Sequence, residues 1–319
     1  LLNMDLLYKR KAAEKQTELF QYKTQRTREY LSFEVKKAYL QLLLAYDAVK
    51  VLEEALKTTQ SVYLFTENHF KQGLIQKSDL LNAQVQKTTI ENNLAKAKSN
   101  IRNVSDELSL LMDRKNGMIY TADSLVREET GMPGLTKQIA TNRSDFLAMQ
   151  KAIESTELMI KANKMSYLPK LNAFGSYQFN DSRMLGFSAG AYLAGVQLSW
   201  DIFKGNATKN NIATQTLERN KLSTELAQQK DQSQLELDKA YRDLADARFS
   251  ITQQELAVAQ ASESLLILQN RYQQGLVNTT DVLLASTQLS QQKFTLAQAV
   301  YNTHVTEAYL QLLTASTNK

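Results

Sequence analysis

The chain has 319 residues, with 38 lysines and arginines against 33 aspartates and glutamates, and a formal net charge of +5. Hydrophobic residues make up 43% of it, which excludes an intrinsically disordered composition. Cysteine is absent, which excludes disulfides, thiolate metal ligands and a cysteine nucleophile. The two histidines have no acidic cluster at ligand spacing around them, so we expect no metal site and no cofactor.

Four long stretches contain neither glycine nor proline, namely 1–72, 74–116, 206–274 and 276–319. They are rich in Ala, Leu, Gln, Glu and Lys, which favour helices. A continuous helix over 206–274 would be roughly 100 Å long. Helices of this length are typical of coiled coils and repeats, and few compact domains could bury one.

An internal repeat relates the two halves of the chain. A shift of 202 residues aligns 35–111 with 237–313 without a gap. Lys37-Ala38-Tyr39 falls on Lys239-Ala240-Tyr241, and Gly73-Leu74 falls on Gly275-Leu276. We infer an internal duplication, because shared helical composition alone rarely keeps one register over such a length.

Each repeat predicts a helical hairpin, with a long helix, a break and a returning helix. A glycine after an amphipathic run is a common helix C-terminal signal, so we expect the turns at Gly73 and Gly275. Ser78-Asp79 and Thr280-Asp281 are expected to cap the returning helices. Breaks so short favour antiparallel neighbours.

The segment between the repeats changes character. Glycine and proline cluster in the connector 116–135, where we expect one short strand at Met118–Thr121. A helix over 136–167 follows and stops before Pro169. The expected divisions are therefore 1–115, 116–135, 136–167, 168–203 and 204–319.

Residues 170–180 and 191–203 alternate apolar and polar side chains, which predicts two strands. One interpretation is a half-buried hairpin on a soluble core. The other, which we favour, is a transmembrane β-hairpin, because extended helices leave little protein to cover its apolar face. Two strands cannot close a barrel, so this interpretation requires further strands or further copies of the chain. The candidate lipid-facing side chains are Leu171, Tyr177, Phe179, Tyr192, Val196, Leu198 and Trp200.

Several segments resemble outer-membrane efflux channels of the TolC type. Residues 196–206 (VQLSWDIFKGN) resemble the family's passage from strand to helix. Residues 271–283 (RYQQGLVNTTDVL) and 69–81 (HFKQGLIQKSDLL) resemble its periplasmic helix tips. Residues 142–146 and 167–171 resemble family segments that precede a strand, so the likeness runs along essentially the whole chain in order.

The resemblance implies a mainly α fold, in which helical hairpins form an α-helical barrel across the periplasm. It also implies a homotrimer whose protomers contribute to a twelve-stranded β-barrel in the outer membrane of a Gram-negative bacterium. The implied function is passive export of drugs, toxins or proteins, without enzymatic activity. The implied partners are a periplasmic adaptor and an inner-membrane pump. Residue 1 falls, by the repeat offset, on Phe203, so we expect this chain to lack the family's N-terminal helix and first strand pair.

Gate residues are predicted near the tips. In a threefold assembly, Asp79 and Asp281 would each form a carboxylate ring that selects cations, although either aspartate could instead cap its helix. Some relatives tighten the closed state with an ion pair, but the corresponding positions here hold Val277 and Leu284. The latch is therefore absent or built differently. Tyr272 is a candidate gate residue or, alternatively, a core side chain.

The tip loops are also expected to bind a partner. Each places apolar residues on a turn, and exposed apolar surface of this kind usually marks an interaction site. The resemblance implies that the adaptor docks there, on Gly73, Leu74, Ile75, Gly275, Leu276 and Val277. The alternative function is a soluble structural coiled-coil scaffold. Nucleic-acid binding is not expected, because lysines and arginines alternate with glutamates along the helices.

Overall fold

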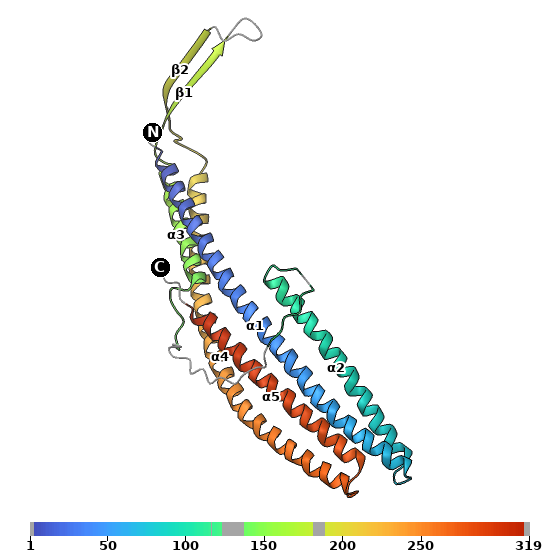
Figure 1. Cartoon of the computed structure of the whole chain (residues 1–319). Coiled ribbons are helices and arrows are strands. Elements are labelled where there is room, and N and C mark those ends of the chain that lie inside the picture. The colour runs from blue at the N-terminus through green and yellow to red at the C-terminus, as the bar shows by residue number, and fades with distance from the viewer. Residues whose placement is uncertain (1–2, 116, 123–136, 181–188, 316–319) are drawn as a thin grey trace. The chain divides into compact units, whose positions relative to one another are not determined.

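The computed structural model of the protein describes residues 3–115, 117–122, 137–180 and 189–315. Within these residues, five helices and two strands follow one another (Figure 1). They are α1 (Met4–Lys71), α2 (Lys77–Leu111), α3 (Ser144–Met165), β1 (Lys170–Asn180), β2 (Ala189–Ser199), α4 (Ala207–Gln273) and α5 (Thr279–Thr314).

The elements form two compact units. The hairpin unit comprises residues 28–139 and 235–315, and the strand unit comprises residues 1–27, 140–234 and 316–319. The unit boundaries fall within α1 and α4, each of which contributes to both units. None of the described helices is long and apolar enough to cross a membrane.

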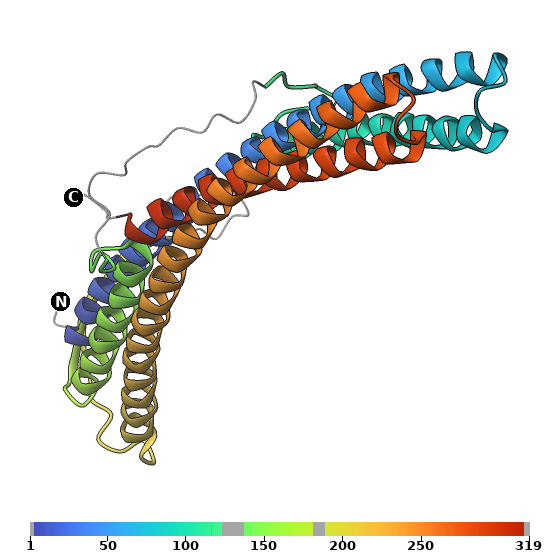
Figure 2. The same cartoon turned by 90° about the horizontal axis from the view of Figure 1, so that it is seen from below.

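In the hairpin unit, α1 pairs with α2 and α4 pairs with α5, as Figure 2 shows. The first seam packs α1 residues at alternating spacings of four and three against α2, which is the knobs-into-holes spacing of a coiled coil. Its α1 members are Ala38, Leu42, Ala45 and Val49. Leu237, Ala240 and Leu244 pack against α5 in the same way in the second hairpin. Burial of each such leucine contributes about 1.5–3 kcal/mol.

The two hairpins confirm the repeat in three dimensions. The last residues of α1 and α4, Lys71 and Gln273, differ by the repeat offset, as do the first residues of α2 and α5, Lys77 and Thr279. Residues from all four helices then share one core near the tips, where Val62 and Ala83 meet Leu265 and Val282. The fold is thus mainly helical, as predicted.

The strand predicted at Met118–Thr121 is wrong, since the described segment 117–122 contains no strand. This segment lies against the first hairpin. Tyr120 receives a hydrogen bond from the Tyr46 hydroxyl on its carbonyl, at 2.8 Å, and its N–H donates to Ser105 at 3.4 Å. Side chains therefore satisfy backbone groups that a strand would have paired with a second strand.

In the strand unit, α3 packs along the first part of α1. The Ser155 hydroxyl donates to the Ala12 carbonyl at 3.0 Å, and Asn163 donates to Gln215 of α4 at 2.8 Å. The helix expected from residue 136 begins later, at Ser144. Arg143, buried at the start of α3, forms two hydrogen bonds with Asp145 and stacks over the Phe146 ring at 4.4 Å. These contacts fix the helix start.

The strands β1 and β2 form an antiparallel hairpin with apolar pairs on one face. Leu171 pairs with Leu198, and Tyr177 pairs with Tyr192. The second strand ends at Ser199, so the prediction that it continues to residue 203 is wrong. Phe174, the exception to the predicted alternation, lies opposite Gly195. Its ring leaves no room for a side chain there, since a Cβ on Gly195 would lie 2.7 Å from it.

Candidate gate and docking surfaces at the hairpin tips

Both hairpin tips are built by the same turn. Gly73 and Gly275 end α1 and α4 with φ of +74° and +71°, a left-handed conformation that favours glycine. Leu74 N–H donates to the His69 carbonyl at 3.0 Å, and Leu276 N–H donates to the Arg271 carbonyl at 2.9 Å. These are Schellman motifs, which satisfy the last carbonyls of a helix.

The returning helices begin differently from each other. The N-cap of α5 is Asn278, whose side chain accepts the backbone N–H of Asp281, while the Asp281 carboxylate accepts the Asn278 N–H at 3.2 Å. The N-cap of α2 is Gln76, and within the described residues its side chain makes no capping hydrogen bond. The prediction that Ser78-Asp79 cap α2 is therefore wrong. For α5 the N-cap is Asn278 instead of Thr280 or Asp281, but Asp281 takes part in the cap. Both aspartates lie inside the first helical turn, where Asp281 completes a capping box.

Tyr272 joins three helices. Its hydroxyl lies 2.7 Å from the Thr66 hydroxyl of α1 and 2.9 Å from the Thr279 hydroxyl of α5. Its ring is buried in the core near the tips and lies 4.9 Å from the Phe65 ring. We call Thr66, Tyr272 and Thr279 the hydroxyl clamp. The clamp carries no net charge, and it connects the first hairpin to the turn of the second.

The other predicted gate residues lie at the surface of this chain. Asp281 is exposed, Asp79 is half-buried, and 63% of Leu284 is exposed. Leu284 therefore projects from the turn of α5 that follows Asp281. Within one chain these three residues do not join the hydroxyl clamp.

The predicted docking residues divide into two sets. Leu74 and Leu276 follow the tip glycines and are 65% and 63% exposed. Ile75 and Val277 are half-buried, and Val277 packs against the core near the tips. Each tip therefore presents one exposed leucine on a turn whose geometry is fixed by hydrogen bonds.

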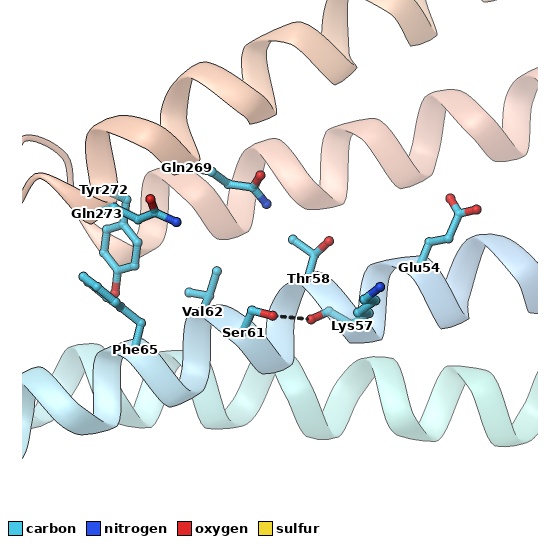
Figure 3. Close-up of a pocket in the computed structure, with 9 residues that line it drawn as sticks. All are labelled: Glu54, Lys57, Thr58, Ser61, Val62, Phe65, Gln269, Tyr272 and Gln273. Carbon is cyan, nitrogen blue, oxygen red and sulfur yellow. Dashed lines mark hydrogen bonds between the residues drawn. The ribbon is translucent and has the colours of Figure 1, made fainter.

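A groove between α1 and α4 lies beside the clamp, as Figure 3 shows. Its volume is about 530 Å³, and Tyr272, Phe65 and Val62 form its apolar end. The rest is polar or charged and comprises Glu54, Lys57, Thr58, Ser61, Gln269 and Gln273. Sequence reasoning missed this groove and both clamp threonines. The sequence held one signal, since Thr59 and Thr66 lie seven residues, or about two helical turns, apart on the buried face of α1.

The predicted lipid-facing residues mostly lie on one face of the hairpin. Tyr177, Tyr192, Val196 and Leu198 are all more than half exposed. Leu171 is half-buried, and the side chain of Phe179 lies outside the described part. Trp200 was predicted within the strand but follows its end. Its indole N–H donates to the Tyr167 carbonyl at 3.0 Å, which fixes it at the base of the hairpin.

The described residues thus combine two long helical hairpins with an amphipathic β-hairpin. The family described as "Outer membrane efflux protein" matches residues 5–113 and 135–316. The chain belongs to this family, which confirms the resemblance found in the sequence. Its members are outer-membrane efflux channels, a class that is not enzymatic.

Individual relatives agree with the family. "Cation efflux system protein CusC" of Escherichia coli (strain K12) is 26% identical over 292 residues, which cover 86% of this chain and 62% of that protein. The chain thus spans less than two thirds of the length of this relative. A crystal structure of CusC superposes with a TM-score of 0.85 at 20% identity, over 98% of this chain and 74% of that one. The structure of the outer-membrane channel OprN superposes with a TM-score of 0.83 at 16% identity, over 98% of this chain and 72% of that one. These two likenesses establish the fold.

Proposed function

We propose that the chain forms part of an outer-membrane channel that exports substrates passively in a tripartite efflux system. The exposed apolar face of β1 and β2 carries this proposal. Tyr192, Leu198 and Val196 expose 85%, 68% and 63% of their surface. Exposing this much apolar surface to water is unfavourable in free energy, whereas exposing it to lipid is not. Eleven residues at about 3.3 Å each give strands of roughly 36 Å, which span a membrane when tilted.

The outer edges of the hairpin favour assembly into a homotrimer. β1 and β2 pair with each other and form a two-stranded sheet in the described part of the chain. Hydrocarbon does not tolerate unpaired backbone groups, so these edges require other strands. Identical strands from further copies would supply partners and close a barrel around the export path.

The hydroxyl clamp supports a gate at the tips. It connects α1 to the α4–α5 turn through uncharged groups, whereas the positions where some relatives place an ion pair hold Val277 and Leu284 here. Movement of the second hairpin away from the first would break the hydrogen bond between Tyr272 and Thr66. In the assembled channel, Asp281, Asp79 and Leu284 would then line the aperture, where carboxylates select cations.

The exposed tip leucines support docking of a periplasmic adaptor, which would link the channel to an inner-membrane pump. Leu74 and Leu276 present apolar surface on rigid turns, a feature that fits a helical hairpin tip of a partner. Such docking would bring the partner next to the clamp and to the groove between α1 and α4.

Single-channel recording in a planar bilayer tests the channel. We expect a small, cation-preferring conductance and a weaker preference in Asp281→Asn. Asp246→Asn removes an exposed carboxylate of α4 away from the tips and serves as the matched control. Protein that stays in the soluble fraction without detergent and gives no conductance would instead support the scaffold function.

Docking is tested at the second tip. Leu276→Asp places a charge on the expected contact, and Gly275→Pro disrupts the turn, so both should abolish drug resistance in cells. Leu276→Met keeps the apolar contact and should preserve it. Trimer formation and bilayer conductance should persist in Leu276→Asp, since the side chain is exposed. Normal resistance in Leu276→Asp would contradict docking at this tip.

A further inference from the structure

An apolar collar lies where the strands meet the helices in the strand unit. Tyr167, Trp200, Ile202 and Phe203 form it, and all four side chains are more than half exposed. Ile202 and Phe203 each expose 81% of their surface. The bond between the Trp200 indole and the Tyr167 carbonyl holds both connections between helix and strand together. Protein covers little of this collar within the chain.

The charges next to the collar are strongly biased. Residues 3–11, 161–170 and 199–209 contain eight lysines and arginines and two aspartates. These thirty residues or so therefore carry a charge of about +6, against +5 for the whole chain. The hairpin unit differs, because residues 28–139 and 235–315 contain 20 basic and 22 acidic residues. Balanced charge is thus the rule along the hairpins, and the collar departs from it.

Both aspartates near the collar are already bound by lysines. Asp5 accepts hydrogen bonds from Lys170 at 3.0 Å and from Lys9 at 3.4 Å, and its side chain is buried. Asp201 forms an ion pair with Lys204. Each aspartate can offset one positive charge, so the surface stays basic. Lys164 in the last turn of α3 and Lys209 in the first turn of α4 are exposed beside the collar.

We propose that this surface binds the phosphate headgroup of an anionic glycerophospholipid in the membrane leaflet on the helix side of the hairpin. The inference rests on the proposed function, since it requires the hairpin to lie in a bilayer. Aromatic side chains settle at the level of the headgroups, and lysines close to the membrane attract anionic lipid. Lysine stems can lie along apolar surface while the ammonium group reaches the phosphate. Lys164 and Lys209 are the binding residues.

The test measures thermal unfolding of the purified protein in a neutral detergent with added lipid. Phosphatidylglycerol should raise the midpoint by roughly 3 °C or more over zwitterionic phosphatidylcholine. The double variant K164Q/K209Q should lose this difference, and the corresponding Lys→Arg variant should retain it. The variant K50Q/K96Q removes the same charge from exposed positions of the hairpin unit and should respond as the wild type does.

Several outcomes would overturn the proposal. An undiminished response to phosphatidylglycerol in K164Q/K209Q would exclude these lysines. An equal shift with inorganic phosphate would show that the surface binds phosphate without recognising a lipid. Failure of the protein to enter vesicles of either lipid would contradict the channel itself. Equal insertion and equal stability in both lipids would contradict only the lipid preference.

Discussion

The Tyr272 hydroxyl illustrates how one residue can serve both core and gate. Its ring belongs to the core near the tips, while its oxygen lies within hydrogen-bonding distance of threonines on two other helices. The sequence left packing and gating as alternatives for this residue. The structure places the ring in the core and the hydroxyl between the hairpins, so the two roles can coexist.

Tyr272→Phe should loosen the clamp while preserving the ring. The Thr279 hydroxyl would lose its partner in a buried site, whereas Thr66 keeps its bond to the Val62 carbonyl. We expect a loss of about 1–3 kcal/mol in unfolding free energy and a higher open probability. Urea unfolding and bilayer recording measure the two effects. Tyr39→Phe, at an exposed tyrosine of α1, should change neither, and an equal effect there would argue against the clamp.

At the scale of elements, the two tips share the turn but differ in how the returning helix starts. The capping box at Asn278 fixes the start of α5, and no side-chain cap fixes the start of α2 among the described residues. Repeat symmetry could not predict this difference, because the two segments diverge at the capping positions. The first tip should therefore open locally more easily than the second.

Asn278→Ala and Gln76→Ala test this difference as a matched pair. Loss of the Asn278 cap should cost about 1 kcal/mol, since one backbone donor loses its partner. Gln76→Ala should be nearly neutral. Amide hydrogen exchange in the first turns of α2 and α5 reports the two starts separately. Equal effects of the two substitutions would refute the assignment of the capping box.

Asp145 provides a pH-dependent test at the start of α3. Burial opposes ionisation of its carboxyl, but the hydrogen bonds and charge of Arg143 outweigh burial and lower its pKa below the usual 3.8. A lowered pKa stabilises the fold above about pH 4, and this contribution is lost as the pH falls through the folded-state pKa. Asp145→Asn leaves Arg143 buried without its counter-charge and should cost roughly 3 kcal/mol at pH 7.

The test measures the unfolding free energy of the wild type and of Asp145→Asn between pH 7 and pH 2. The difference in unfolding free energy between the two proteins should shrink in the acidic part of this range. Glu157→Gln, at another carboxylate of α3, provides the control. A difference that stays constant down to pH 2 would show that the ion pair does not contribute as proposed.

At the scale of the whole molecule, the sequence predicted most of the fold. The absence of glycine and proline predicted the long helices. The repeat offset and its two glycines predicted both tips, because helix termination at glycine is a local property. The predictions that were wrong concern residues whose structure depends on contacts with distant parts of the chain. Met118–Thr121 lies against the first hairpin. The strand β2 ends at Ser199, because the next residue, Trp200, would pair with Pro169, which has no N–H to donate. The clamp also escaped prediction, since it joins residues 206 positions apart.

The regular spacing of the seam residues determines how the helical hairpins can change in length. Residues contact across each pair at intervals of three and four, and the turn chemistry at Gly73 and Gly275 involves only nearby backbone. Inserting one heptad into each of the four hairpin helices would lengthen both hairpins by about 10 Å and leave the register and both turns unchanged. An insertion into a single arm would shift the seam against its partner. Evolution could therefore match the reach of the protein to the width of a compartment by adding or deleting whole heptads in concert.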